Sequence, residues 1–350
     1  MEFPVLRHPI VQAPMAGGPS TPELAAAVSA AGGLGFVAAG YDSAETLRAG
    51  IRAVRARTDA PFGVNIFVPS AEKADQAAVD AYAARLRGEA ERYGVPLGVP
   101  VDDDGEWRHR LAVVAEERVP VVSFTFGLPS REVIEEARRA GAYVIVTVTT
   151  PDEAVAAHEA GADALVAQGI EAGGHRGGFT DDAGDFGLLV VLRLALRLTP
   201  LPVVAAGGIT DGAGVAAVLA AGAVAAQLGT AFLLAPEAGT SVAHREALRS
   251  YDRTAVTRAF TGRRARGLVN RFLEEHTGEA PSAYPQVHHL TAPLRAAARK
   301  AGDAGAINLW AGQGFRLAEE VPAGELVRRL GAEAEEALTR AAHRLGHLGR

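Results

Sequence analysis

Eight short apolar runs recur along the chain, and longer alanine-rich stretches with helical periodicity separate them. The runs contain few alternating polar residues, which is typical of parallel strands that are covered on both faces. A (β/α)8 barrel needs eight such strands, each followed by a helix. The runs cover residues 10–12, 34–38, 62–68, 119–126, 143–148, 164–167, 202–206 and 224–228.

The joints between helices and strands repeat one another. An Ala-Gly-Ala triplet occurs at 140–142, 160–162 and 221–223, each time between a helical stretch and the next apolar run. Glycine there supplies the left-handed conformation that ends a helix. A doubly wound open sheet would show the same joints with fewer strands. From the number and spacing of the strands, we therefore predict an α/β fold of the TIM-barrel type, a (β/α)8 barrel.

Two segments exceed the strand–helix rhythm. After the third run, residues 69–118 predict a helix at 71–93, a turn region at 94–105 and a further helix. After the eighth run, residues 236–302 predict a mostly helical insertion. Active sites of barrel enzymes lie at the rim where this insertion leaves and re-enters, so we expect it to be a substrate-side lid.

These segments divide the predicted chain into a barrel domain, residues 1–235 and 303–350, and the insertion. In the tail, residues 305–330 are amphipathic enough to supply the last barrel helix. In the insertion, the arginine-rich stretch 258–266 predicts a solvated helical face. An arginine of this stretch turned toward an anionic substrate is the alternative.

Composition excludes several classes of function. The net charge of −6 and the pI near 6.0 argue against a nucleic-acid binder, which needs a basic face to neutralise phosphates. The chain has no cysteine, which excludes disulfides, thiolate nucleophiles, iron–sulfur clusters and cysteine-bound zinc. We find no signal-peptide pattern and no run of about 20 apolar residues that could cross a membrane. We expect a cytoplasmic protein, a monomer or homodimer, that acts on a small molecule.

Glycine-rich loops follow three of the predicted strands. Barrel enzymes commonly bind a phosphate with the loops after strands seven and eight. The backbone N–H groups of Gly207, Gly208 and Gly229 can approach phosphate oxygens because these residues lack Cβ, and the Thr230 hydroxyl can add a bond. A tight turn without a ligand is the alternative for any one loop, but two such loops on adjacent strands favour a phosphorylated ligand. The loops cover residues 168–178, 205–209 and 227–230.

His175 stands in the loop after the sixth strand, with two glycines before it and two after its neighbour Arg176. A neutral imidazole can take a proton near neutral pH, and the glycines leave room for a flat ring beside it. We therefore take His175 as the candidate catalytic residue. A solvated loop histidine or a structural hydrogen-bonding residue is the alternative.

Three further side chains lie at or near the ends of strands. Asn65 and Gln168 can offer amide groups to a ring or a ribityl chain, or can act as loop caps. Met15 can lie against an aromatic ring as a soft contact, or belong to the core. The adjacent pair His288-His289 does not predict a metal site, because neighbouring side chains rarely converge on one ion. We therefore predict no metal site.

At these residues the chain resembles the nitronate monooxygenases, also called the 2-nitropropane dioxygenase family, essentially from end to end. The most specific motif is Glu-Ala-Gly-Gly-His at 171–175. The other motifs are Pro-Ile-Val-Gln-Ala-Pro-Met-Ala-Gly-Gly at 9–18, Gly-Val-Asn-Ile-Phe at 63–67, Val-Ser-Phe-Thr-Phe-Gly-Leu-Pro at 122–129, His-His-Leu-Thr at 288–291 and Asn-Leu-Trp-Ala-Gly-Gln-Gly at 308–314.

The resemblance implies an FMN barrel that oxidises alkyl nitronates, for example propionate 3-nitronate, with O2 to a carbonyl compound and nitrite without NAD(P)H. Neutral nitroalkanes are a further candidate substrate. The resemblance also implies that His175 is the catalytic base, which removes the α-proton of a nitroalkane or positions a nitronate that is already ionised. The implied FMN contacts are Met15, Asn65, Gln168, Gly173, Gly174, Gly207, Gly208, Gln227, Leu228, Gly229 and Thr230.

Departures from the family's pattern concern the substrate. Some members carry tyrosines and a lysine on the late helical segment. Here Tyr284 and His288 are the candidate substrate contacts, and Ala292 follows at the next i+4 step. Some members also have a histidine in the strand-four motif, where this chain has Thr125. The choice between nitronate alone and nitroalkane as well therefore stays open.

Three alternative interpretations stay open beside the nitronate one. The nearest is an FMN-dependent enoyl-acyl-carrier-protein reductase, which shares the barrel and a very similar Glu-Ala-Gly-Gly-His loop but needs NAD(P)H. The motif at 124–127 and the long late insertion favour the nitronate interpretation. A flavin-free phosphate-binding barrel commonly uses a barrel lysine or a carboxylate base, whereas Lys73 and Lys300 lie outside every predicted strand. A non-catalytic flavin carrier is the third.

Overall fold

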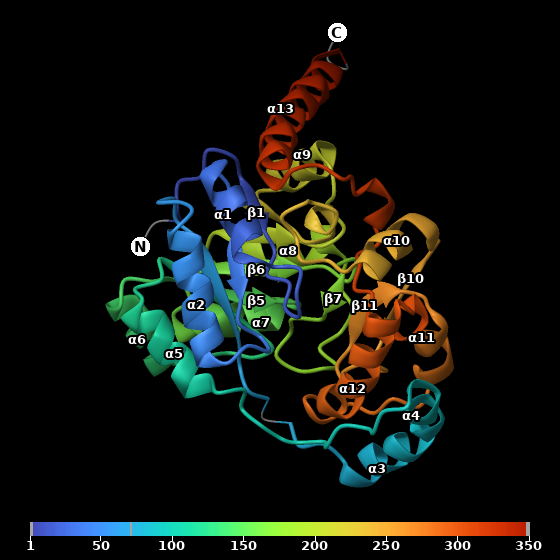
Figure 1. Cartoon of the computed structure of the whole chain (residues 1–350). Helices are drawn as coiled ribbons and strands as arrows, with labels where there is room; N and C mark the ends of the chain where they lie inside the picture. Colours follow the sequence, from blue (N-terminus) through green and yellow to red (C-terminus); the bar gives the residue numbers. More distant parts are fainter. Residues whose placement is uncertain (1–2, 71, 348–350) are drawn as a thin grey trace.

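The computed structural model describes residues 3–70 and 72–347. Eight parallel strands form one sheet in the order β1-β9-β8-β6-β5-β4-β3-β2. The sheet closes between β1 and the segment before β2, because Gln12 N–H donates to the Leu34 carbonyl and Leu34 N–H donates to the Ile10 carbonyl, both at 2.9 Å. The predicted (β/α)8 barrel is therefore confirmed (Figure 1). Its strands are β1 (Ile10–Gln12), β2 (Phe36–Ala38), β3 (Gly63–Phe67), β4 (Val121–Thr125), β5 (Tyr143–Val148), β6 (Ala164–Gln168), β8 (Val203–Ala206) and β9 (Ala225–Leu228).

Apolar side chains fill the inside of the barrel. Val11, Phe36, Ile145, Val166 and Val204 come from different strands, are all buried and belong to one packed cluster. Such layers of branched side chains make the centre of a small barrel a packed core rather than a pore. The strands therefore carry buried residues on both faces, as their continuous hydrophobicity predicted.

Helices cover the outside of the barrel, and several begin at a side-chain cap. Thr21, Ser43, Ser130 and Thr150 each accept a hydrogen bond from a backbone N–H of the following first turn. These bonds satisfy donors that a helix start leaves unpaired. The outer helices are α1 (Pro22–Ala30), α2 (Ala44–Arg55), α6 (Arg131–Arg139), α7 (Pro151–Ala160), α8 (Leu188–Leu198) and α9 (Gly212–Ala220).

The predicted glycine joints are confirmed. Gly141, Gly161 and Gly222 follow the ends of α6, α7 and α9 with φ of +96°, +102° and +103°. A side chain is strained in this left-handed region, whereas glycine adopts it at little cost.

The long segment after β3 leaves the barrel and returns. The predicted helix at 71–93 is two helices, α3 (Gln76–Arg85) and α4 (Arg87–Tyr93), and residue 71 lies outside the described residues. Both helices pack against α12 (Gln286–Ala301), and Figure 1 shows them beside it, away from the barrel. The chain then returns to the barrel through α5 (Trp107–Glu116).

The predicted helical face at 258–266 is wrong. β10 (Thr254–Thr257) and β11 (Ala265–Leu268) form an antiparallel hairpin, and the short strand β7 (Gly174–His175) pairs with β11. We call residues 254–268 the arginine-rich hairpin. The side chains of Arg263 and Arg266 are buried in it because they donate hydrogen bonds to backbone carbonyls of the loop after β6. The insertion also contains three helices, α10 (Val242–Ser250), α11 (Arg271–His276) and α12.

The last barrel helix begins later than predicted. α13 (Ala323–His347) packs against α9 and α1, and its C-terminal part projects from the barrel in Figure 1. The stretch 305–322, which was expected to begin this helix, is irregular apart from short 3-10 turns. Glycine at 305, 312 and 314 disfavours a helix there. The division into a barrel, 1–235 and 303–350, and a lid, 236–302, stays a prediction.

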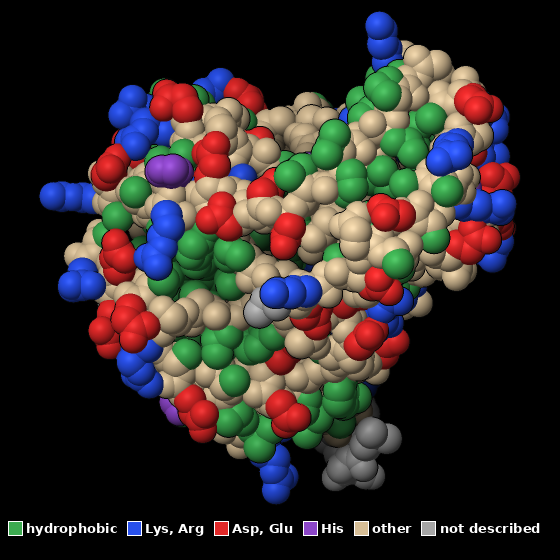
Figure 2. Space-filling view, turned by 90° about the horizontal axis from the view of Figure 1, so that it is seen from below, with side chains coloured by type: hydrophobic (Ala, Val, Ile, Leu, Met, Phe, Trp, Pro, Cys, Tyr) green, Lys and Arg blue, Asp and Glu red, His purple; other side chains and the backbone are tan. Residues whose placement is uncertain are grey.

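The surface gives two further observations. No helix within the described residues combines the length and the hydrophobicity that crossing a lipid bilayer requires. On the face in Figure 2, acidic and basic side chains are interspersed with apolar patches. This face therefore carries charge of both signs.

The close packing of α1 against Gly35, which precedes β2, predicts that a single added methyl group at this position strongly lowers stability. A Cβ at Gly35 would lie 2.0 Å from the backbone oxygen of Ala25 in α1, so Gly35→Ala forces the helix away from the strand. We expect a loss of about 1–3 kcal/mol or more in the free energy of unfolding, measured by urea denaturation.

Gly88→Ala is the matched control. A Cβ at Gly88, within α4, would meet no atom within 4 Å, and alanine is a better helix former than glycine by about 1 kcal/mol. We expect this variant to be unchanged or slightly more stable. Equal stability of the two variants would contradict the close packing of α1 on the strand.

Candidate active site

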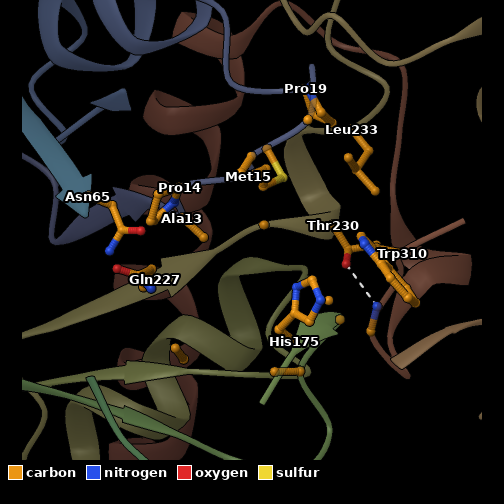
Figure 3. Close-up of a pocket in the computed structure, with 18 of the residues that line it drawn as sticks. Ala13, Pro14, Met15, Pro19, Asn65, His175, Gln227, Thr230, Leu233 and Trp310 are labelled. Carbon is orange, nitrogen blue, oxygen red and sulfur yellow. Dashed lines mark hydrogen bonds between the residues drawn. The ribbon is translucent and has the colours of Figure 1, made fainter. Parts of the chain in front are cut away.

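A cavity of about 420 Å³ opens at the carboxyl ends of the barrel strands. Loops that follow β1, β2, β4, β6, β8 and β9 form its wall together with side chains of β3, β4 and β5 and with residues 307–314, which cross the mouth. Ligand sites of barrel enzymes occupy this end of the fold. Figure 3 shows side chains from these loops around the cavity, with His175 facing it.

The wall of the cavity contains no acidic side chain. Among the described residues that line it there is no aspartate or glutamate, whereas His175, His244 and Arg299 belong to it. A wall without carboxylates does not repel an anion, and guanidinium and backbone N–H groups attract one. The cavity therefore favours an anionic or phosphorylated ligand.

The structure brings most of the predicted site residues to this cavity. Leu228 is an exception, because its side chain is buried in the core. Tyr284 and His288 also lie outside the wall, in an aromatic layer beside His175. The roles of all these residues stay predictions. Those that line the cavity are Met15, Asn65, Gln168, Gly173, Gly174, His175, Gly207, Gly208, Gln227, Gly229 and Thr230.

Two amide side chains on the wall have unused hydrogen-bonding capacity. Asn65 Nδ2 donates to Ser123 Oγ and to Thr125 Oγ1, each at 2.9 Å. Asn65 Oδ1 and the whole Gln227 amide have no hydrogen-bond partner among the described residues. Amide groups inside proteins are nearly always paired, so these two are suited to the polar edge of a ligand. Both are drawn in Figure 3.

The amide of Gln168 holds the loop that follows β6, which is one of the two roles predicted for it. Its Nε2 donates to the His175 carbonyl at 3.0 Å, and its Oε1 accepts from Gly177 N–H at 2.9 Å. Glu171, the acidic residue of the family motif, points away from the cavity and accepts two bonds from Leu188 N–H at the start of α8. Both side chains therefore hold the loop between β6 and α8, residues 169–187, which we call the His175 loop.

Glycine is required at several points of the wall. Gly207 and Gly208 have φ of +121° and +71°, a region that other residues rarely adopt. A Cβ at Gly173 would lie 2.4 Å from Gly312 N, so this glycine lets the His175 loop touch the segment that crosses the mouth. Thr230 Oγ1 accepts a bond from Gly312 N–H at 3.0 Å (Figure 3), which leaves its own hydrogen available to a ligand.

His175 lies between aromatic rings, and one of its nitrogens is bound. The centroid of its ring is 5.4 Å from those of Phe126 and Trp310 and 6.1 Å from that of Tyr284. Its Nε2 lies 2.9 Å from Thr261 Oγ1. The ring is thus held by the arginine-rich hairpin on one side while it lines the cavity on the other.

The imidazole of His175 is neutral at physiological pH. Burial lowers the pKa of His175 to about 3, with the positive charges of Arg263 and Arg295 as further causes and Asp181 acting in the opposite direction. Desolvation disfavours the charged form of a base, and a nearby cation adds to the effect. The ring is therefore neutral, with a hydrogen on one nitrogen and a lone pair on the other.

Two buried arginines carry this positive charge. The Arg263 guanidinium lies 4.4 Å from the centre of the Phe126 ring, and Arg295 Nη2 donates to the His288 carbonyl at 2.8 Å. Among the described residues, no carboxylate forms an ion pair with Arg263 or with Arg295. A buried cation without a counter-ion is costly and extends its field through the low-dielectric interior. The field favours an anion in the cavity.

The aromatic layer beside His175 contains both predicted substrate contacts. The ring of His288 stacks on that of Tyr41 at 4.2 Å, and burial lowers the pKa of His288 to about 2. Burial also raises the pKa of Tyr284 well above its usual range. Both side chains are therefore neutral, and Tyr41, which stacks on His288, lines the cavity.

Sequence reasoning missed several residues of the site. Tyr41, Phe126 and Trp310 belong to the wall, and Thr261 binds His175 from behind it. Trp310 lies in a motif shared with the family, which is a signal that could have identified it. Tyr41 and Thr261 are brought to the site by distant parts of the chain, and no local pattern marks them.

The fold and the cavity define a barrel enzyme with a glycine-rich, anion-accepting site at the carboxyl ends of its strands. The family model that describes nitronate monooxygenase matches residues 4–333. The chain belongs to the nitronate monooxygenase family, an oxidoreductase family, as the sequence motifs predicted.

Relatives and solved structures agree with this assignment. The chain is 46% identical over 336 residues to a nitronate monooxygenase of Pseudomonas aeruginosa, with 93% of this chain and 95% of that protein covered. It is 43% identical over 344 residues to a nitronate monooxygenase of Paraburkholderia phytofirmans, with 94% and 93% covered. The structure of a nitroalkane oxidase from Streptomyces ansochromogenes superposes with a TM-score of 0.93 at 55% identity and covers 96% of this chain and 98% of that one.

The reductase alternative has weaker support. The structure of FabK from Thermotoga maritima superposes with a TM-score of 0.78 at 31% identity, with 97% of this chain and 96% of that one covered. Both values are lower than those for the nitroalkane oxidase. The shared barrel therefore does not favour the reductase interpretation over the nitronate one.

The buried neutral histidines predict that acid destabilises the protein. Burial, as the main cause, lowers the pKa of His175, His244 and His288 to about 3, about 4 and about 2. Below pH 6.5 the unfolded chain takes up protons that the folded chain refuses, so stability is lost as pH falls from 6.5 toward 4. Each group contributes up to about 1.4 kcal/mol per pH unit.

Urea denaturation at pH 7, 6 and 5 measures this slope. His288→Asn removes one of the three groups and should give a shallower slope than the parent. A stability that does not change over this range, or a variant with an unchanged slope, would contradict the burial of neutral imidazoles.

Proposed function

We propose that this chain catalyses the oxidation of alkyl nitronates by O2, with bound FMN, to a carbonyl compound and nitrite. The observation that carries the proposal is a neutral imidazole, His175, on the wall of a cavity that glycine loops enclose and that no described carboxylate lines. The names of the relatives support the nitronate as substrate. The nitroalkane oxidase neighbour supports neutral nitroalkanes as a second candidate.

The residues of the cavity fit a flavin mononucleotide. Backbone N–H groups of Gly208 and Gly229, with the Thr230 hydroxyl, would hold the phosphate. Asn65 Oδ1 and the Gln227 amide would bond to the polar edge of the ring. FMN, when bound, supplies the electron transfer between substrate and oxygen, for which proteins rely on a cofactor.

The remaining predicted contacts have less support. Met15 lies over the cavity in Figure 3, where its thioether would contact the face of an aromatic ring. A Cβ at Gly174 would meet no atom within 4 Å, so open space adjoins this residue. Gln168 and Gly207 were also predicted from their positions after strands, and both line the cavity. Gly173 lines the cavity as well, and its contact with FMN, like that of the buried Leu228, is proposed from the family resemblance.

His175 would act on the substrate in one of two ways. For a neutral nitroalkane, the imidazole would accept the α-proton and so form the nitronate within the cavity. For a nitronate that is already ionised, it would position the anion. In both cases the rings of Phe126 and Trp310 limit the access of water to the imidazole.

The charge of the site would favour the anionic form of the substrate. Arg263 and Arg295 are buried without a carboxylate partner among the described residues, and a nitronate would supply the missing negative charge. Burial, with these charges as a further cause, lowers the pKa of His175 and keeps its ring neutral. The substrate contacts proposed from the family, Tyr284 and His288, would act through this layer because neither lines the cavity.

We further propose that residues 236–302 serve as a lid. The segment contributes Thr240, His244 and Arg299 to the wall and binds His175 through Thr261. Movement of this segment would open the cavity and at the same time release the imidazole.

Replacement of His175 tests its role as base. We expect His175→Asn to retain FMN but to lower the turnover of nitroethane by about 10²–10⁴-fold, the usual contribution of a general base. Ethyl nitronate, which needs no deprotonation, should lose much less. Oxygen uptake measures both rates. His158→Asn, a change of an exposed histidine of α7 that does not line the cavity, is the control and should keep nitroethane turnover.

If nitroethane turnover is unchanged in His175→Asn while FMN stays bound, His175 is not the base.

Stopped-flow mixing under argon separates the proposal from the reductase alternative. We expect slow reduction of the bound flavin by NADH and rapid reduction by ethyl nitronate, because the cavity is proposed to select the nitronate anion. Rapid reduction by NADH together with no oxygen uptake on propionate 3-nitronate would overturn the proposed function.

A further inference from the structure

The arginine-rich hairpin holds the His175 loop at several points. Arg258 Nε donates to Asp181 at 2.5 Å, and Arg264 Nη2 donates to Asp185 at 2.7 Å. Arg263 Nε donates to the Arg176 carbonyl at 3.1 Å. These bonds and the pairing of β7 with β11 fix the backbone on both sides of His175. They do not by themselves decide how its ring is protonated.

Thr261 contacts the ring directly. Its Oγ1 lies 2.9 Å from His175 Nε2 and 3.3 Å from the Arg263 carbonyl oxygen. Its side chain is buried, with 1% of the residue exposed, and it does not line the cavity. Thr261 therefore acts on the imidazole from the side opposite the ligand space.

The number of hydrogens decides the direction of these bonds. A threonine hydroxyl has one hydrogen to donate, and a carbonyl oxygen can only accept. If both contacts are hydrogen bonds, the hydroxyl donates to Arg263 O and accepts from His175 Nε2–H. A neutral imidazole carries one hydrogen, so Nδ1 then holds the lone pair. Nδ1 has no hydrogen-bond partner among the described residues, which leaves it free for a substrate proton.

The other charged and titratable groups around His175 do not offer a competing partner. Arg263 and Arg295 are cations and cannot accept a hydrogen bond. Asp181, the carboxylate whose charge acts on the ring, is bound to Arg258 and to Arg264 N–H. The neighbouring Tyr284 contacts the imidazole through its ring face and edge. The tautomer therefore depends on one hydroxyl group.

We propose that Thr261 is a positioning residue that fixes His175 as the Nε2–H tautomer, with Nδ1 as the atom that accepts the substrate proton. The inference rests on the proposed function for its catalytic consequence, but the tautomer itself is a property of the protein alone. Loss of the hydroxyl frees the ring to rotate and to exchange its hydrogen between the two nitrogens.

Nitrogen-15 NMR of histidine-labelled full-length protein tests the tautomer without any need for turnover. In the parent protein we expect His175 Nε2 to be the protonated nitrogen and Nδ1 the unprotonated one at pH 7. Thr261→Val, which keeps the shape of the side chain but removes the hydroxyl, should give a mixture of tautomers. Thr261→Ser should restore the pattern of the parent.

Kinetics of the FMN-loaded variants test the consequence. We expect Thr261→Val to lower kcat/KM for nitroethane at least about tenfold, part of the 10²–10⁴-fold of a general base, while the value for ethyl nitronate changes less than about threefold. Thr261→Ser should recover nitroethane turnover. Similar losses on both substrates in the two variants would show a merely structural role and overturn the inference.

The NMR result separates this inference from the proposed function. An Nδ1–H tautomer in the parent, or an unchanged pattern in Thr261→Val, overturns the role of Thr261 whatever the enzyme oxidises. A parent protein with the expected tautomer that oxidises neither substrate supports the assignment of the tautomer and contradicts the proposed function instead.

Discussion

The join between the His175 loop and the arginine-rich hairpin is the contact on which the site depends. The barrel fixes the ends of its strands but not the residues within long loops. The loop after β6 is nineteen residues long, 169–187, and contains glycine at many positions. Such a loop has a high conformational entropy that must be offset by contacts. The hairpin supplies them through β-pairing, through arginine bonds to backbone carbonyls and carboxylates, and through Thr261. The candidate base is thus held by the arginine-rich hairpin, a segment that does not belong to the eight-stranded barrel sheet.

The same join sets the electrostatics of the cavity. Arg263 approaches the back of the aromatic wall because the hairpin binds the loop there, and Arg295 reaches the same region from α12. Neither has a carboxylate partner among the described residues, and no described carboxylate lines the cavity. Burial of a cation in this way is unfavourable for folding. We interpret this unfavourable burial as a term that an anionic ligand offsets on binding. Together with burial, which is the larger cause, the same charge keeps the His175 imidazole neutral by lowering its pKa.

Much of the fold could be predicted because local patterns determine it. Continuous apolar runs and the glycine joints at 141, 161 and 222 are consequences of β/α geometry, and the barrel followed from their number. The arginine-rich hairpin could not be predicted, because its arginines are buried by carbonyl partners that come from residues far away in the sequence. The last helix was placed too early because amphipathic spacing in 305–330 outweighed the glycines at 305, 312 and 314.

The candidate site likewise contains residues that local sequence patterns predict and residues that only the folded chain brings together. The glycine loops, Asn65 and His175 were predicted from their positions at or after strand ends, Gln227 was predicted from the family resemblance, and all of them line one cavity. Gln168 lines the cavity, and its amide also bonds within the loop, a role that was predicted as the alternative but whose partners only the folded path of the chain reveals. Tyr41 and Thr261 come from segments without a local signature. Sequence motifs therefore predict the part of the cavity wall that lies at the strand ends. They do not predict the residues that other loops and the insertion contribute to the site.

The visible absorption spectrum of the purified full-length protein, before and after incubation with FMN, is the most direct measurement of the central claim. We predict a bound flavin with absorption bands in the blue region, and release of FMN in a one-to-one ratio to the chain on heating. A colourless protein that takes up no FMN when the cofactor is supplied would contradict the claim that the cavity at the ends of β6, β8 and β9 is a flavin site.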